Sequence, residues 1–256
     1  MIRAIFFDFD GTLLSHAQKM VPPSTRRALD RLREKGIKRV LATGRHMLEL
    51  AMLPGNDLDF DAYITLNGQL CLDAGENVLF GKPITGADRE SILRSFREKA
   101  MPVQLVEKDA MYCNFVNESM AAAQRAISTP IPAVGEYTGS EIYQAVFYVE
   151  KEKESLVSER LCACKIARWN EHAVDIIPCP GGKAEGIAEF LRLNRIDRAE
   201  TMAFGDGEND IEMLQFAQTG IAMGNAADTV KRQADFVTDS VDDDGVEKAL
   251  IKLGVI

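Results

Sequence analysis

The stretch MIRAIFFDFDGTLL, residues 1–14, contains the feature from which the fold can be worked out. A short apolar run with aromatic residues, typical of a buried strand, leads directly into two aspartates, Asp8 and Asp10, and then into Gly11-Thr12. Ionised carboxylates lose much favourable hydration when they are buried, so a core packed only for stability has no use for them. The end of this strand is therefore predicted to be a site that requires negative charge.

The whole chain has 256 residues, 46% hydrophobic and 27% charged, which fits one large or two modest globular domains. Its net charge is −9 and no basic block offsets it, so nucleic acid and anionic membranes are not expected partners. The sequence predicts neither a secretory signal nor a membrane span, so the cytoplasm is the expected location. The five cysteines lack the spacing of a zinc site.

Strand-like and helix-like segments alternate in the first part of the chain and again after residue 180. IKRVLATG (37–44) and DAYITLNG (61–68) read as further strands, and PPSTRRALDRLREKG (22–36) reads as an amphipathic helix. Alternation of this kind predicts an α/β fold with a doubly wound, mainly parallel sheet. Residues 1–83 and 180–256 are the predicted core.

The pattern changes between residues 84 and 179. TGADRESILRSFREKA (85–100) reads as a helix that begins with a capping box of Thr85 and Asp88. VQLVE (103–107) and MYCNFV (111–116) read as antiparallel strands, and so do the segments ARWN and AVDIIP. Residues 84–179 are therefore predicted to form an inserted α+β domain.

Three further polar clusters lie where predicted strands end or helices begin: LATGRH (41–46), PCPGGKAEG (178–186) and FGDGENDIEML (204–214). Each alone also fits a plain structural role, since Thr43 could cap a helix, Lys183 could lie on the surface, and the acidic turn could begin a helix. Ligands of open α/β sheets bind beyond the carboxyl ends of the strands. We therefore expect the clusters and Asp8 to meet at one edge of the sheet.

The residue types in these clusters favour phosphate and a metal. A hydroxyl beside a glycine N–H at a helix start, as in Thr43-Gly44, can hold a phosphate, and Arg45 can add a guanidinium. The helix dipole disfavours a lysine in a first helical turn, so Lys183 indicates an anionic partner. The oxygen-rich run of residues 206–210 suits a hard cation, and Mg²⁺ is the expected one beside phosphate.

DFDGTLL, ATG, GGKAEGI and GDGEND resemble, in order, the four motifs of the haloacid dehalogenase superfamily, and the inserted block resembles the cap of its Cof-type phosphatase branch. The resemblance implies that Asp8 is a nucleophile that attacks phosphorus and that Asp10 is a general acid and base. The expected ligands of the substrate are Thr43, Gly44, Arg45, Lys183 and Asn209. The expected ligands of Mg²⁺ are Asp8, Asp10 through its carbonyl, Asp206 and Asp210.

Taken together, these features predict a Mg²⁺-dependent phosphatase that hydrolyses small phosphorylated metabolites, such as sugar phosphates, through an aspartyl phosphate, with the inserted domain as a lid. Asp10 favours hydrolysis of an ester, whose leaving oxygen needs a proton. Its carboxylate neighbours would raise its pKa, whereas a cation would lower it. A phosphosugar mutase with the same aspartates and a non-catalytic module that binds phosphometabolites remain open as alternatives.

Overall fold

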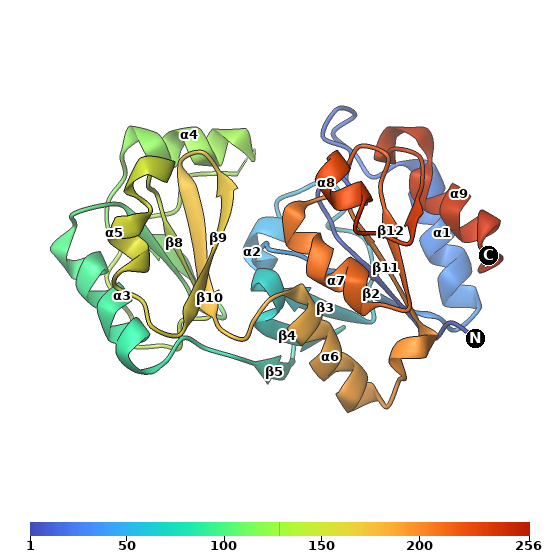
Figure 1. Cartoon of the computed structure of the whole chain (residues 1–256), viewed down its shortest axis with the longest axis horizontal. Helices are drawn as coiled ribbons and strands as arrows, with labels where there is room; N and C mark the ends of the chain where they lie inside the picture. The colour runs from blue at the N-terminus through green and yellow to red at the C-terminus, as the bar shows by residue number, and fades with distance from the viewer. Residues whose placement is uncertain (128) are drawn as a thin grey trace. The chain divides into compact units, whose positions relative to one another are not determined.

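The computed structural model describes residues 1–127 and 129–256. The chain divides into two compact units, one made of Met1–Phe80 with Gly182–Ile256 and the other of Gly81–Gly181. Figure 1 shows a sheet with helices in each of them. Across the described residues, every helix is too short or too polar to cross a membrane.

The first unit is built on an eight-stranded sheet with the strand order β13-β12-β11-β1-β2-β3-β4-β5. The strands from β13 to β3 in this order pair in parallel, and β4 is antiparallel to β3. The strands are β1 (Ala4–Phe7), β2 (Lys38–Ala42), β3 (Ala62–Thr65), β4 (Leu70–Asp73), β5 (Val78–Gly81), β11 (Thr201–Gly205), β12 (Thr219–Ala222) and β13 (Phe236–Val237).

Helices cover both faces of this sheet, as Figure 1 shows, so the predicted doubly wound α/β fold is confirmed. They are α1 (Pro23–Glu34), α2 (Met47–Leu50), α6 (Lys183–Asn194), α7 (Ile211–Phe216), α8 (Asp228–Lys231) and α9 (Gly245–Lys252). Short 3₁₀ turns lie at η1 (Leu66–Gly68), η3 (Arg198–Glu200), η4 (Glu208–Asp210) and η5 (Val241–Asp243).

Strand β1 lies between β11 and β2 and is fully buried on both faces. Alternate side chains of a strand point to opposite faces. Ile5 and Phe7 therefore pack in the core that α1 and α9 cover, whereas Ala4 and Phe6 pack in the core that α6 and α7 cover. Each fully buried aromatic or aliphatic side chain stabilises the fold by about 1.5–3 kcal/mol. Burial on both faces explains why the run before Asp8 is continuously apolar.

The second unit is a five-stranded sheet with the order β7-β6-β8-β10-β9, in which each pair of neighbours is antiparallel. The predicted α+β pattern and its two antiparallel pairings, β6 with β7 and β9 with β10, are confirmed. The strands are β6 (Val103–Val106), β7 (Met111–Cys113), β8 (Gln144–Phe147), β9 (Cys164–Asn170) and β10 (Ala173–Pro178); the helices are α3 (Gly86–Glu98), α4 (Glu118–Ala126), α5 (Ser155–Ser158) and the 3₁₀ turn η2 (Lys151–Lys153).

The predicted capping box at the start of α3 is wrong. Thr85 is the N-cap residue, but its side chain makes no capping hydrogen bond. Asp88 is buried and accepts hydrogen bonds from the backbone N–H groups of Cys162 and Ala163, each at 2.7 Å. A contact between residues more than seventy positions apart has replaced the local one, which spacing along the helix could not indicate. Helix α4 was not predicted either.

Candidate active site

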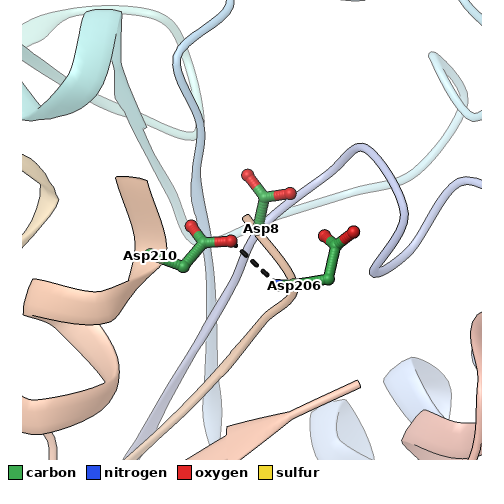
Figure 2. A group of neighbouring side chains, drawn as sticks. All are labelled: Asp8, Asp206 and Asp210. Carbon is green, nitrogen blue, oxygen red and sulfur yellow. Dashed lines mark hydrogen bonds between the residues drawn. The ribbon is translucent and has the colours of Figure 1, made fainter. Parts of the chain in front are cut away.

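Two parallel strands, β1 and β11, bring the first and last acidic clusters together. Phe7 lies opposite Phe204 in the register of these strands, so Asp8 and Asp206 both follow at their carboxyl ends. Asp210 comes from η4, directly after β11. Asp8, Asp206 and Asp210 each offer a carboxylate oxygen, and these three oxygens lie within 4.8 Å of one another. Figure 2 shows the three side chains gathered around one space.

Lys183 links two of these carboxylates. Its Nζ donates hydrogen bonds to Asp8 Oδ1 at 2.5 Å and to Asp210 Oδ1 at 2.6 Å, and its side chain is 0% exposed. Burial works against the charged form, but the charges of Asp210 and Asp8 outweigh it and raise the pKa of Lys183. The unusual lysine at the first position of α6 therefore has anionic partners within the protein itself.

The other oxygen of Asp210 shapes the loop after β11. Asp210 Oδ2 accepts hydrogen bonds from the backbone N–H groups of Asp206, at 2.9 Å, and Gly207, at 2.8 Å; the bond to Asp206 is the dashed line in Figure 2. Asp210 thus connects the ammonium group of Lys183 with the backbone that carries Asp206. Because Asp210 is fully buried, this connection is shielded from water.

Two residues without a role in the sequence-based prediction hold the carboxylate of Asp206. Thr12 Oγ1 lies 3.1 Å from Asp206 Oδ1, and Asn225 Nδ2 lies 3.1 Å from Asp206 Oδ2. Asn225 Nδ2 also donates to the carbonyl of Gly11 at 2.9 Å. Asn225 follows β12, the next parallel strand. Because ligands of such sheets bind beyond the carboxyl ends of the strands, this position could have been predicted from the sequence.

The charges of the cluster suit a divalent cation. The three carboxylates lie beside one ammonium group, which contacts two of them, so negative charge remains in a largely buried space. Burial, followed by the charge of Asp210, raises the pKa of Asp8 well above its usual value. The same two causes raise the pKa of Asp206 to about 7. Carboxylate oxygens are preferred ligands of Mg²⁺, so the donor set fits this ion.

Asp10 lies apart from this cluster and is contacted by the side chains of Arg45 and His16. Arg45 donates from Nε to Asp10 Oδ2 at 2.5 Å and from Nη2 to Oδ1 at 2.8 Å, and His16 Nε2 lies 3.1 Å from Oδ1. Burial raises the pKa of Asp10, but the hydrogen bonds from His16 and Arg45 prevail and lower it to about 2. The hydrogen bond to Asp10 raises the pKa of His16. Arg45, an expected ligand of the substrate, is thus paired with Asp10 in this structure.

Thr43 and Gly44 directly follow β2, as predicted, but the helix after them begins later than expected. Helix α2 begins at Met47 with His46 as its N-cap, so Thr43-Gly44 is not at a helix start, and that expectation is wrong. His46 Nδ1 accepts a hydrogen bond from Leu48 N at 3.0 Å, so this side chain pairs a backbone N–H group in the first turn of α2. The buried Thr43 Oγ1 instead accepts from Arg45 N at 3.1 Å.

Asn209 and Gly44 both lie beside the side chain of Asn67. Asn209 Nδ2 donates to Asn67 Oδ1 at 3.1 Å. A Cβ atom on Gly44 would lie 3.0 Å from the same oxygen, so the backbone and the amide approach each other closely. Asn67 follows β3, and its φ of 53° is in the left-handed region that asparagine tolerates better than most residues. The segments that follow β2, β3 and β11 therefore meet at the side chain of Asn67.

The sequence matches the haloacid dehalogenase-like hydrolase family over residues 5–250. The chain belongs to this family. It is 32% identical over 257 residues to the Bacillus subtilis (strain 168) protein named "Putative phosphatase YkrA", and the match covers 99% of this chain and 98% of that protein. The resemblance inferred from the four motifs is therefore confirmed.

Solved structures agree with the family assignment. BT1666 from Bacteroides thetaiotaomicron, described among phosphatases of the haloalkanoate (HAD) superfamily, is 34% identical with a TM-score of 0.91, and the match covers 100% of this chain and 96% of BT1666. BT4131, described as a HAD subclass IIB sugar phosphatase, is 33% identical with a TM-score of 0.86, and the match covers 99% of this chain and 100% of BT4131. The chain is thus an enzyme of a hydrolase family in which these similar proteins are named as phosphatases.

Proposed function

We propose that this protein is a Mg²⁺-dependent phosphatase that hydrolyses small phosphorylated metabolites, with sugar phosphates as the leading substrate class, through an aspartyl phosphate on Asp8. The observation that carries the proposal is the convergence of Asp8, Lys183, Asp206 and Asp210 at the ends of β1 and β11. The sugar class is supported by the similarity to BT4131, which is described as a sugar phosphatase.

Asp8 is the proposed nucleophile. In the first step a carboxylate oxygen of Asp8 bonds to phosphorus, the bond from phosphorus to the ester oxygen breaks, and Asp10 gives its proton to the leaving oxygen. In the second step a water oxygen bonds to phosphorus while Asp10 takes a proton from that water, and the bond between phosphorus and the Asp8 oxygen breaks to release phosphate and the free carboxylate. The proton gained in the second step restores the acid form of Asp10 for the next turnover.

A carboxylate and a phosphate repel each other, so the site must offset their charges. The ammonium group of Lys183 donates a hydrogen bond to Asp8, and its positive charge offsets part of this repulsion. The proposed ligands of Mg²⁺ are Asp8, the backbone carbonyl of Asp10, Asp206 and Asp210. When bound, Mg²⁺ supplies positive charge that stabilises the charge developing on the phosphoryl oxygens. The proposed phosphate ligands are Thr43, Gly44, Arg45, Lys183 and Asn209.

The decisive experiment offers sugar phosphates and p-nitrophenyl phosphate to the purified protein with Mg²⁺ and measures released phosphate. Release should cease on chelation of the metal and in the Asp8→Asn variant, because this variant loses the attacking carboxylate. Asp109→Asn, a change at an exposed aspartate of the β6–β7 turn, should leave the rate unchanged. Undiminished release by Asp8→Asn would reject the proposal. An isomerised phosphosugar in place of free phosphate would indicate a mutase, and saturable binding without turnover would indicate a binding module.

The Asp10→Asn variant should be slow but still active. General acid–base catalysis by a positioned side chain contributes about 10²–10⁴-fold to a rate, so kcat for a sugar phosphate should fall by about this factor. Formation of the phosphoenzyme on Asp8 from p-nitrophenyl phosphate should fall less, because its leaving group departs without a proton. Rapid-quench measurement of the phosphoenzyme compares the two substrates. Equal losses on both would contradict the role given to Asp10.

A further inference from the structure

One hydrogen-bond donor near the candidate site lies outside all four sequence motifs. His16 is on the short turn between Ser15 and Met20, which are joined by hydrogen bonds between their backbones. About half of its side chain is exposed, yet its Nε2 lies 3.1 Å from Asp10 Oδ1. Since His16 is absent from the hydrophobic core, packing does not account for this contact.

The turn that carries His16 is firmly attached to the first unit. Leu13 and Leu14 are buried, and their backbone N–H groups both donate to the carbonyl of Phe9. Ser15 is also buried, and its Oγ lies 2.5 Å from Asp242 Oδ1 in η5. These contacts fix the backbone on the N-terminal side of His16. Its imidazole is therefore presented to Asp10 from a defined position.

The two oxygens of Asp10 differ in the donors around them. Oδ1 accepts from Arg45 Nη2 and lies 3.1 Å from His16 Nε2, whereas Oδ2 accepts from Arg45 Nε. Each carboxylate oxygen has about two acceptor positions, so Arg45 Nη2 and a proton on His16 Nε2 would together occupy both positions of Oδ1. Oδ2 accepts one hydrogen bond, from Arg45 Nε, and its second acceptor position is left for the proton that is transferred. The side chain of Asp10 is 29% exposed, which leaves it accessible to a reacting molecule.

We propose that His16 is a positioning residue for Asp10, which holds Oδ1 so that Oδ2 is the oxygen that exchanges the proton with the leaving group and with water. Arg45 donates hydrogen bonds to both oxygens of the carboxylate. His16 contacts Oδ1 from a separate segment of the chain, and this second contact opposes rotation of the carboxylate. The inference rests on the proposed function, because it assigns a role only if Asp10 transfers protons.

The test compares His16→Phe, which keeps a planar ring but removes the donor, with His16→Gln, whose amide can donate to Asp10. Rapid-quench experiments with Mg²⁺ measure the rate of phosphoenzyme formation from glucose 6-phosphate, which needs a proton on its leaving oxygen, and from p-nitrophenyl phosphate, which does not. Gln18→Ala, a change at an exposed residue of the same turn, is the matched control. Urea denaturation checks that each variant is folded, and His16→Ala replaces His16→Phe if the latter is not.

We expect His16→Phe to slow phosphoenzyme formation from glucose 6-phosphate by about tenfold, a part of the 10²–10⁴-fold that general acid–base catalysis contributes. The rate from p-nitrophenyl phosphate should change less than about twofold and KM should stay similar, while His16→Gln should recover most of the loss. Equal losses on both substrates, no loss on either, or a Gln variant as slow as the Phe variant would overturn the proposal. An unmodified enzyme that released no phosphate would instead reject the proposed function, and this inference with it.

Discussion

At the scale of single residues, Lys183 balances part of the negative charge of the site. Its side chain is fully buried between Asp8 and Asp210. Removing one partner of a buried ion pair leaves an uncompensated charge and costs about 3–5 kcal/mol. Lys183→Met should therefore lower the free energy of unfolding by about this amount in urea denaturation without metal, and Mg²⁺ should restore part of it. Lys248→Met, at an exposed ion pair, should change it by less than about 1 kcal/mol. A Lys183→Met protein as stable as the unmodified one would contradict this account.

Two glycines with similar backbone conformations allow a test of the turn after β1. Gly11 has a φ of 73° and Gly254 a φ of 69°, so alanine is strained at both positions. A Cβ atom on Gly11 would lie 2.2 Å from Asp206 Oδ2, whereas one on Gly254 would meet nothing within 4 Å. Gly11→Ala should displace the carboxylate and weaken Mg²⁺ binding by about tenfold or more in calorimetry, the lower end of what loss of a supporting contact costs a metal site. Gly254→Ala should bind Mg²⁺ as before, and a matching loss there would remove the steric explanation.

At the scale of secondary-structure elements, Asp88 joins α3 to the segment before β9. Its hydrogen bonds to Cys162 N and Ala163 N lower its pKa, although burial opposes them. A carboxyl whose pKa is lower in the folded state stabilises the fold above its unfolded pKa of about 3.9, and this contribution is lost as the pH falls through the folded value. Asp88→Asn should lower the free energy of unfolding at pH 7 by about 1–2 kcal/mol and flatten its decline in acid. Urea denaturation from pH 7 to pH 3 would show this, and an unchanged acid profile would contradict it.

At the scale of the whole molecule, the proposed metal ligands belong to one of the two units. Asp8, Asp206 and Asp210 all lie in the unit of Met1–Phe80 and Gly182–Ile256. A ligand that binds only the folded state stabilises it by about 2.7 kcal/mol at one hundred times its dissociation constant. Mg²⁺ should therefore slow hydrogen exchange in β1 and β11 and leave β6 and β10 largely unchanged, as measured by mass spectrometry. Equal protection of both units would show that metal binding also stabilises the inserted one.

Much of this fold follows from local pattern and chain order. The apolar run before Asp8, the alternation of strands and helices, and the change to hairpins in the middle of the chain each predicted an element that the structure contains. Helix α4 escaped prediction, and the apparent capping box of α3 was misleading. A short polar residue near a helix start fits several partners equally well, and only packing selects one of them.

Pattern and chain order are enough to predict the α/β class, the inserted α+β unit and the gathering of acidic residues at one edge of the sheet, because parallel strands in a chain of this order present their carboxyl ends together. Which side chains are partners at that edge depends on how the folded elements pack. Lys183 meets Asp8 across 175 positions and Arg45 meets Asp10 across 35, while Asn225 contacts Asp206 from the turn after β12, a strand that carries no motif. Spacing along the chain indicates neighbours within a few residues, whereas these contacts exist only because packed elements bring distant segments within hydrogen-bond distance.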